Sequence, residues 1–462
     1  MHTEEENGKP RRFSLHGNWS SRLVFVLAVT GSAVGLGNIW KFPYIAGQNG
    51  GGAFVLVYLV CVAVIGLPVM ISEIMIGRRG RRNPVATMAL LGEEEGSTRQ
   101  WRWLGALGIA SGALVLSYYS VIAGWTLVYI PKSLTGQFSG QDAAGITAIF
   151  DRFTGDWRAL LAAHTVFMAM TVFVVARGIQ RGLEQAVRIL VPGLVVLMLV
   201  LLGYAVFSGG FAAGVAFMFK PDFAALTWEG VLQAIGQAFF TLSLGMGAVM
   251  AYGAYLPQET SIIRVSAAVV VADTAIAMLA GLVVFPLVFA NGLDPADGPG
   301  LVFLTLPLAF GQMAGGVVFA TVFFVLLGLA AWTSGLGIVE AGVAWCMERT
   351  GCKRIKASAF VGGMIWLLGI GTVLSFNVLA DLEFLKGNIY RNVDYLSSNI
   401  MLPLGGLLIT VFAAWVMCRN STAEELGGAG PYYRAWRFLA RYVAPAAIIL
   451  VFLQAIGLIG GS

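Results

Sequence analysis

Long apolar segments alternate with short polar connections along almost the whole 462-residue chain. A membrane-spanning helix needs about 20 predominantly apolar residues, and eleven segments meet that length. They are residues 21–45, 52–77, 103–131, 160–177, 185–207, 231–255, 262–290, 316–347, 357–378, 395–418 and 437–459. Charged residues make up only 11% of the chain, which excludes an ordinary soluble domain. The pattern therefore predicts an all-α polytopic membrane protein with a mobile polar segment at its N-terminus.

The first span is interrupted where the bilayer should be deepest. Residues Gly31 to Pro43 read GSAVGLGNIWKFP, with three glycines, an asparagine, a lysine and a proline. Glycine and proline both weaken a helix, and broken backbone within a membrane persists only where it is buried in protein or lines a cavity. Freed carbonyls could hold a cation, and freed amides could hold an anion. Close glycine packing between helices is the alternative, but it explains Asn38 and Lys41 less well.

The sixth span carries a second interruption at Phe240 to Gly247, which reads FTLSLGMG. Two broken helices five spans apart predict a five-plus-five inverted repeat with a binding site between its halves. On this basis the chain divides into an N-terminal segment, a first repeat, a second repeat, and a connecting segment with the last span. Their boundaries are residues 1–18, 19–207, 208–418 and 419–462.

Several polar residues within the spans have two readings each. Asp273 should face a cation, unless it is a neutral acid in a hydrogen bond. Glu73 is either a structural acid, protonated or paired with backbone, or a brace for the broken backbone of spans 1 and 6. Tyr119 could contact a substrate or bond another span. Thr333 and Ser334 could supply hard oxygen ligands to a cation, or bond back to their own helix.

Three further features concern the ends of the spans. Gly182 and Pro192 predict either unwinding or a proline kink at the inner end of span 5. The apolar, proline-containing loop at residues 298–316 predicts a re-entrant cap. Asp394, at the outer mouth of span 10, would form a gate if it paired with Lys41.

The distribution of charge predicts the orientation in the membrane. With the N-terminus inside, 22 of the 29 Lys and Arg residues fall on the inner side. The positive-inside rule then predicts a multi-pass protein of the cell's plasma membrane, with a cytoplasmic N-terminus and an external C-terminus. A net charge of +5 distributed in this way does not indicate nucleic-acid binding. The four cysteines and three histidines have no metal-site or disulfide spacing, and no nucleophile has an acid–base partner in the spans. An enzyme is therefore not predicted.

Three motifs resemble the neurotransmitter:sodium symporter family. They are Gly31 to Pro43, residues 236–245 (GQAFFTLSLG), and Thr305-Leu306-Pro307 in the outer loop. The likeness runs from about Trp19 to span 11 and is nearest to the bacterial leucine-transporter-like branch. The eleven predicted spans are one fewer than many members have.

The resemblance implies two sodium ions. The first would lie among the Ala33 carbonyl, Asn38, Thr241, Asp273 and the substrate carboxylate. The second would be bound by the carbonyls of Gly31, Val34 and Ala330 and by the hydroxyls of Thr333 and Ser334.

The resemblance also implies an amino-acid site. The substrate amine would meet carbonyls of Ala33, Phe240 and Thr241, near the Ser243 hydroxyl, and the carboxylate would meet the amides of Leu36 and Gly37 and the Tyr119 hydroxyl. The side-chain pocket would be lined by Val115, Tyr119, Phe240, Ser243, Met246, Ser334 and Ile338. Phe240 would cover the substrate, Lys41 and Asp394 would form the outer gate, and Gly182 with Pro192 would mark an exit for the second sodium.

Three departures from the family pattern refine this expectation. Many members have asparagine where Asp273 stands, and the chloride-dependent ones supply the missing charge with chloride, so no chloride requirement is expected here. Amine transporters place an aspartate at the position of Gly35, so the substrate should bring its own carboxylate. His16 replaces the usual inner-gate arginine, so Arg11 or Arg12 would pair with Glu348.

Together these features predict sodium-coupled symport of a neutral, hydrophobic L-amino acid into the cell by alternating access. Gly335, Gly337 and Met246 suggest room for a large apolar or aromatic side chain. The alternatives are an aliphatic amino acid, a zwitterion resembling GABA or betaine, and a channel. Apart from the substrate, the ions and the lipid bilayer, the sequence predicts no partner, and it leaves the oligomeric state open.

Overall fold

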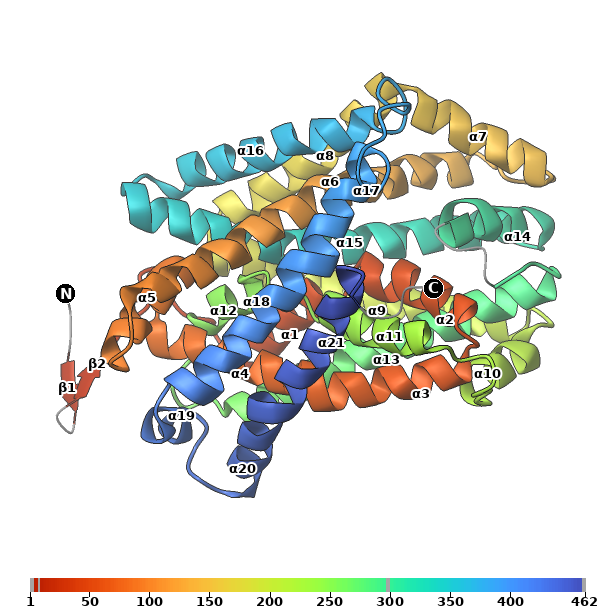
Figure 1. Cartoon of the computed structure of the whole chain (residues 1–462). Helices are drawn as coiled ribbons and strands as arrows, with labels where there is room; N and C mark the ends of the chain where they lie inside the picture. Colours follow the sequence, from red (N-terminus) through yellow and green to blue (C-terminus); the bar gives the residue numbers. More distant parts are fainter. Residues whose placement is uncertain (1–3, 7–8, 296–299, 459–462) are drawn as a thin grey trace.

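The computed structural model describes residues 4–6, 9–295 and 300–458 (Figure 1). The first half comprises β1 (Glu4–Glu6), β2 (Lys9–Arg11), α1 (Arg22–Ala33), η1 (Gly37–Lys41), α2 (Phe42–Gln48), α3 (Gly52–Cys61), η2 (Val62–Gly66), α4 (Leu67–Gly80), α5 (Pro84–Glu94), η3 (Arg99–Trp101), α6 (Arg102–Leu134), α7 (Ala143–Gly155), α8 (Trp157–Ala176), η4 (Ile179–Glu184) and α9 (Gln185–Val206). The second half comprises α10 (Phe211–Phe219), α11 (Trp228–Thr241), α12 (Ala248–Gly253), α13 (Ile262–Ala290), η5 (Leu301–Thr305), α14 (Leu306–Gln312), α15 (Gly316–Thr350), α16 (Arg354–Leu374), α17 (Ile389–Asp394), η6 (Tyr395–Met401), α18 (Leu402–Val411), η7 (Phe412–Val416), α19 (Arg419–Glu425), α20 (Pro431–Phe438), η8 (Leu439–Val443) and α21 (Ala444–Ala455).

The helices agree with the eleven predicted spans. Among the described residues, nine helices are long and apolar enough to cross a membrane, and the bent pair of α1 with η1–α2 makes a tenth. The remaining predicted span is α11 with α12, two helices too short to cross a membrane individually. The all-helical transmembrane architecture is therefore confirmed.

Both predicted breaks are present. Helix α1 ends at Ala33, and the chain bends by 54° before it continues as η1 and α2. Helix α11 ends at Thr241, and the next six residues are not helical. Within them Gly245 has φ +79°, and a Cβ there would lie 2.7 Å from the Leu402 carbonyl oxygen. A side chain at this position would thus be strained both by the backbone and by its neighbour.

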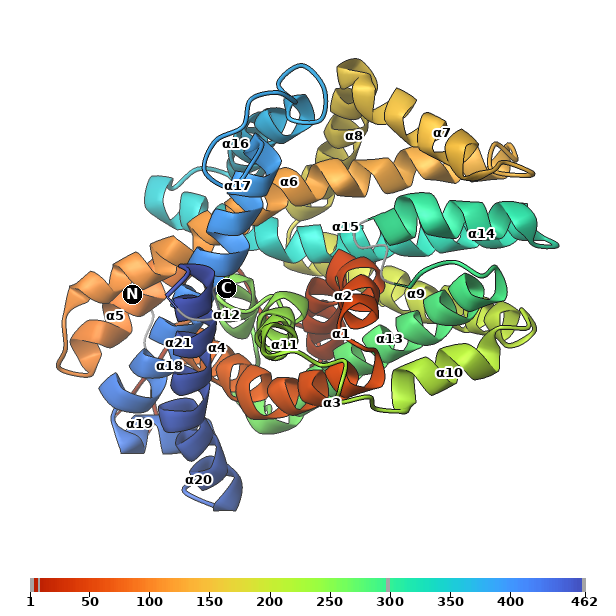
Figure 2. The ribbon, with the colours of Figure 1, turned by 45° about the vertical axis from the view of Figure 1, so that its right-hand side comes forward.

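The broken helices occupy the centre of the molecule. Figure 2 shows α1, α2, α11 and α12 surrounded by other helices, with α6, α15, α8 and α16 on one side and α3, α10 and α13 on another. The polar backbone of the breaks is thereby enclosed by protein, as a membrane interior requires.

Two other predictions about the connections can be compared with the structure. The outer loop contains the short apolar helix Leu301–Gln312, whose Phe303 and Phe310 side chains are buried, although residues 298–299 lie outside the described part. The inner end of span 5 is helical: the π-helical turn η4 is followed by α9, which contains Pro192.

The N-terminal segment, which the sequence predicted to be mobile, contains the antiparallel pair β1–β2.

Candidate functional site

A buried carboxylate joins the two broken helices. Asn38 Nδ2 donates to Asp273 Oδ1 at 2.8 Å, and Thr241 Oγ1 donates to Asp273 Oδ2 at 3.1 Å. Asn38 Oδ1 in turn accepts the Gly35 N–H at 3.0 Å. Asn38, Thr241 and Asp273 are fully buried, and no Lys, Arg or His side chain of the described residues forms an ion pair with Asp273. The group combines hard oxygen atoms with a carboxyl group that has no basic partner among the described residues, an arrangement that suits a small cation.

A second group of oxygen atoms lies where α1 meets α15. A Cβ at Gly31 would lie 3.4 Å from Thr333 Cβ and 2.9 Å from Val191 Cγ2, so the two helices touch at this glycine. Thr333 Oγ1 donates to the Leu329 and Ala330 carbonyls at 3.1 and 3.0 Å. The hydroxyl proton therefore points back along α15, which leaves the lone pairs of Thr333 available for a cation.

A cavity lies between the breaks, α6 and α15. It is lined by Ala33, Gly35, Gly37, Val115, Tyr119, Phe240, Ser243, Met246, Ser334 and Ile338. All seven residues predicted for the side-chain pocket are among them, as are Ala33 and Gly37. Two other predicted contacts, Leu36 and Thr241, lie beside the cavity and not on its lining. The lining contains no charged side chain, so the cavity suits a ligand without net charge.

The breaks hold their backbone through bonds between helices. The Leu36 N–H donates to the Tyr119 hydroxyl at 3.2 Å, Gln237 Nε2 donates to the Gly37 carbonyl at 2.8 Å, and Ser243 Oγ donates to the Ser32 carbonyl at 3.0 Å. Tyr119 thus makes the bond between spans that the sequence left open. Gln237 was not predicted to have a role, although a glutamine inside an apolar helix was an available signal.

Glu73 braces the break in span 6. Its Oε1 accepts the Gly245 N–H at 2.6 Å, while Ser111 Oγ donates to the Gly245 carbonyl at 3.1 Å. Both readings of Glu73, backbone pairing and bracing, are therefore realised at span 6.

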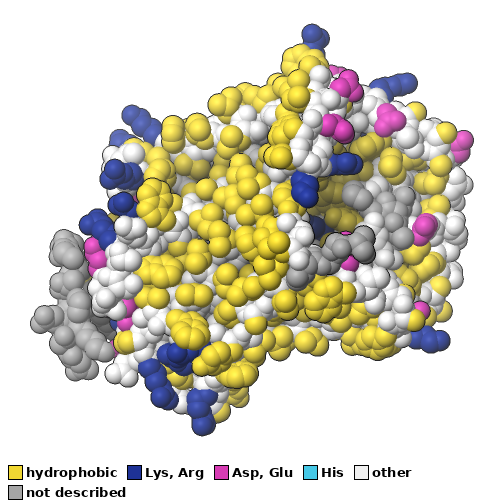
Figure 3. Space-filling view, in the orientation of Figure 1, with side chains coloured by type: hydrophobic (Ala, Val, Ile, Leu, Met, Phe, Trp, Pro, Cys, Tyr) yellow, Lys and Arg dark blue, Asp and Glu magenta, His cyan; other side chains and the backbone are white. Residues whose placement is uncertain are grey.

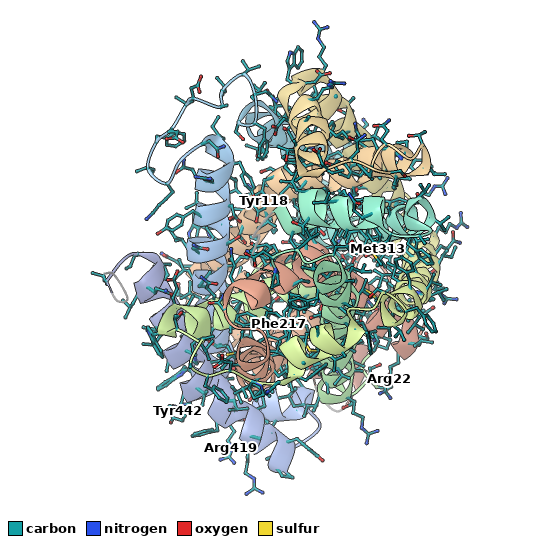
Figure 4. The ribbon with its side chains drawn as sticks, turned by 90° about the vertical axis from the view of Figure 1, so that its right-hand side faces the viewer. Arg22, Tyr118, Phe217, Met313, Arg419 and Tyr442 are labelled. Atoms are coloured by element: carbon teal, nitrogen blue, oxygen red, sulfur yellow. The ribbon has the colours of Figure 1, made fainter. Side chains whose placement is uncertain are left out.

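At the outer end, no salt bridge joins Lys41 and Asp394 within the described part of the chain. Lys41 Nζ lies 4.0 Å from the centre of the Phe240 ring instead. Asp394 Oδ1 accepts a hydrogen bond from Ser398 Oγ at 2.8 Å, and the same hydroxyl contacts Tyr118, which is labelled in Figure 4.

The N-terminal segment covers the end of the molecule that the charge distribution predicts to be the inner one. Trp19 is buried, and its Nε1 donates to the Tyr252 carbonyl at 3.2 Å. His16 Nε2 lies 3.0 Å from Glu348 Oε1. The expectation that Arg12 takes this place was wrong, because Arg12 pairs with Glu94 at 2.9 Å and its place at Glu348 is filled by His16. The Arg11 side chain lies outside the described residues.

This geometry can be set beside known proteins. The model of the Sodium:neurotransmitter symporter family matches residues 16–149 and 151–459. The chain belongs to this family. An uncharacterized sodium-dependent transporter of Bacillus subtilis, YhdH, is 39% identical over 445 residues, which cover 96% of this chain and 98% of the relative. The crystal structure of MhsT in complex with L-phenylalanine is 41% identical, with a TM-score of 0.88 over 95% of this chain and 99% of that one.

A more distant relative is the bovine sodium-dependent neutral amino acid transporter B(0)AT2. It is 28% identical over 280 residues, which cover 53% of this chain and 36% of that protein. The membership and these relatives make the protein a sodium-dependent symporter with membrane-spanning helices.

Proposed function

We propose that this symporter carries a neutral, hydrophobic L-amino acid, with an aromatic one favoured, into the cell together with Na⁺. The observation that carries the proposal is the uncharged cavity at the two helix breaks, with the buried Asp273 group beside it. A zwitterion brings equal charges of both signs, so it needs no charged side chain in the cavity. The similar protein MhsT crystallised in complex with L-phenylalanine, which supports the same class of substrate.

The first Na⁺ would bind the Ala33 carbonyl, Asn38, Thr241 and Asp273. The substrate carboxylate would complete its ligands, because the cavity begins at Ala33 and Gly37. Each ligand then binds more tightly when the other is present, and the coupling is reciprocal by linkage.

The second Na⁺ would bind the carbonyls of Gly31, Val34 and Ala330 and the hydroxyls of Thr333 and Ser334. These ligands come from both α1 and α15, which touch at Gly31. A bound Na⁺ would therefore hold the broken helix α1 against the unbroken helix α15. Loss of this ion would then free α1 to move away from α15.

Residues at both breaks support the proposed class of substrate. Met246 is a flexible side chain, and it lines the cavity between Gly245 and Gly247, both of which have positive φ. A Cβ at Gly35 would lie 2.6 Å from the Tyr119 hydroxyl, so there is no room for an aspartate of the amine-transporter type.

Transport would proceed by alternating access with the N-terminus in the cytoplasm. The bundle of spans 1, 2, 6 and 7 would rock against the remaining spans of the two repeats, 19–207 and 208–418. Trp19 and the His16–Glu348 pair would separate when the inner side opens, and Lys41 and Asp394 would act at the outer side. Because Asp273 supplies a fixed negative charge, the cycle would not require chloride.

The experiment that tests the substrate is a binding panel of the twenty amino acids on purified protein, by thermal shift or scintillation proximity. We expect stabilisation by large apolar amino acids in Na⁺ and none in K⁺. If only aliphatic amino acids stabilise the protein, the proposed substrate becomes an aliphatic amino acid and not an aromatic one. If no amino acid binds to or stabilises the protein in either salt, the proposal is overturned.

A further inference from the structure

Four arginines lie where the tenth and eleventh spans meet at the inner end. Arg419 begins α19, and Arg434, Arg437 and Arg441 follow on α20 and η8. The last three are separated by three and four residues, so they form one stripe along the helix. We call these four residues the basic corner. Arg419 and Arg434 are exposed, and Arg437 and Arg441 are half-buried.

The charges of the basic corner are not neutralised by the described protein. None of the four arginines has a carboxylate within salt-bridge distance among the described residues. Arg437 bonds only neutral groups, the Tyr433 and Thr422 hydroxyls, at 3.0 and 3.4 Å. The Arg441 Nε atom is buried without a hydrogen-bond partner.

Some arginines at the same end are paired with carboxylates. Arg78 Nε lies 2.8 Å from Glu425 Oε2, and Arg12 and Arg79 each lie 2.9 Å from a Glu94 oxygen. Carboxylates therefore neutralise part of the positive charge at this end, but not the charge of the basic corner.

Exposed aromatic rings flank the basic corner. The Arg441 guanidinium lies 4.1 Å from the centre of the Trp415 ring, and Trp415 Nε1 donates to the Arg441 carbonyl at 3.1 Å. Tyr432, Phe438 and Tyr442 are more than half exposed. Figure 3 shows basic side chains beside hydrophobic ones over α19 and α20, and Figure 4 labels Arg419 and Tyr442 at this end. Aromatic rings with this distribution are typical of the boundary between membrane and water.

We propose that the basic corner binds the headgroup of an anionic phospholipid, with the orientation given under Proposed function. Guanidinium groups match phosphate oxygens in a planar, two-bond geometry, and basic clusters beside a span attract anionic lipid. The same helix continues into exposed apolar residues, Ile449 and Leu450, and Ile449 lies seven residues after Tyr442 on the same face. The helix thus offers a headgroup contact and a surface for an acyl chain in the correct order.

The bound lipid would adjoin a joint between spans. Helix α19 carries Glu425, which pairs with Arg78 of α4, and Thr422, which accepts the bond from Arg437. A lipid at the basic corner would thus stabilise the contact of span 2 with spans 10 and 11.

The test uses the full-length protein in detergent and measures its thermal unfolding during titration with dioleoyl phosphatidylglycerol or dioleoyl phosphatidylcholine. We expect the anionic lipid to raise the unfolding temperature and the zwitterionic one to have little effect. In R434Q/R437Q/R441Q the concentration of anionic lipid needed should rise at least about tenfold. The control R349Q/K353Q/K356Q removes three exposed basic charges elsewhere at the same end and should respond like the wild type.

An equal response to both lipids, an unchanged response in the triple variant, or an equal loss in the control would overturn the proposal. If the triple variant does not fold, R434Q replaces it, because the Arg434 side chain is exposed and has no hydrogen bond or ion pair with the described residues. A response of R434Q unchanged from the wild type would then overturn the proposal. The readout requires neither substrate nor transport. Failure of the proposed amino-acid function would therefore be recognised separately, in the binding panel.

Discussion

Two fully buried carboxylates have opposite surroundings. Glu340 of α15 pairs with the Arg354 guanidinium and accepts a hydrogen bond from the Tyr255 hydroxyl at 2.9 Å. Asp273 of α13 has hydrogen bonds from Asn38 and Thr241 and no basic partner among the described residues. A buried charge needs a partner of opposite sign. Glu340 finds that partner within the chain, whereas Asp273 has none among the described residues, and we propose that the transported Na⁺ takes this place.

Glu73 is a third buried carboxylate, and its surroundings are intermediate between those of Glu340 and Asp273. It has no basic partner in the described part of the chain, but it accepts a backbone N–H, at Gly245. A protonated acid keeps an oxygen that can accept this bond, so Glu73 does not need a cation in the way that Asp273 does.

The largest expected effect is that of D273N. Removing a buried, hydrogen-bonded charge partner costs about 2–5 kcal/mol, so the Na⁺ concentration for half-maximal amino-acid binding should rise at least about 30-fold. Scintillation proximity with a radiolabelled amino acid at increasing Na⁺ measures this. An unchanged Na⁺ dependence would show that Asp273 does not hold the ion.

E340Q should instead destabilise the fold and leave Na⁺ binding unchanged. Arg354 would remain at a buried position without its carboxylate, at a cost of about 3–5 kcal/mol in unfolding free energy. Chemical unfolding followed by tryptophan fluorescence would detect the loss, and E340L/R354M should recover most of it. A rise in the Na⁺ requirement of E340Q would remove the distinction between the two carboxylates.

G35A tests whether position 35, in the first break near Asn38, must lack a side chain. The added Cβ would lie 2.6 Å from the Tyr119 hydroxyl and 3.1 Å from Ser334 Cβ, and overpacking costs about 1–3 kcal/mol. Amino-acid affinity should fall by about fivefold to 150-fold, because 1.4 kcal/mol corresponds to a factor of about ten. In G236A the new Cβ meets no atom within 4 Å, so equilibrium binding should stay at the wild-type value. Equal losses in both variants would point to a general effect on helices and not to this contact.

The smallest effect is expected for E73Q. Glutamine keeps an oxygen that can accept the Gly245 N–H, so stability should change by about 1 kcal/mol and Na⁺ dependence should not change. The same unfolding and Na⁺ titrations apply. A Na⁺ requirement raised as far as in D273N would mean that Glu73 also serves an ion.

Much of this architecture could be predicted from the sequence, because the membrane restricts what polar residues can do. Glycines and hydroxyls inside spans 1 and 6 indicated the breaks, and the family motifs indicated the residues that line the cavity. Asp273 was expected to face a cation from its depth alone. A glutamine inside the apolar sixth span was a signal for Gln237, but its bond to Gly37 was not predicted, because it depends on how α11 packs against the first break.

Contacts at the two ends were harder to predict, because several partners lie within reach of each charged side chain there. Lys41 lies over the Phe240 ring and does not pair with Asp394, and His16 contacts Glu348 in place of Arg12. The π-helical turn at span 5 likewise reflects packing, since a Cβ at Gly182 would lie 2.2 Å from the Val174 carbonyl oxygen.

The most direct test of the central claim is Na⁺-driven uptake of the bound amino acid into proteoliposomes with chloride fully replaced by gluconate. If Asp273 supplies the negative charge that the first Na⁺ requires, the initial rate should equal the rate in chloride. A collapse of uptake in gluconate would contradict the account, because the charge would then have to come from chloride and not from Asp273.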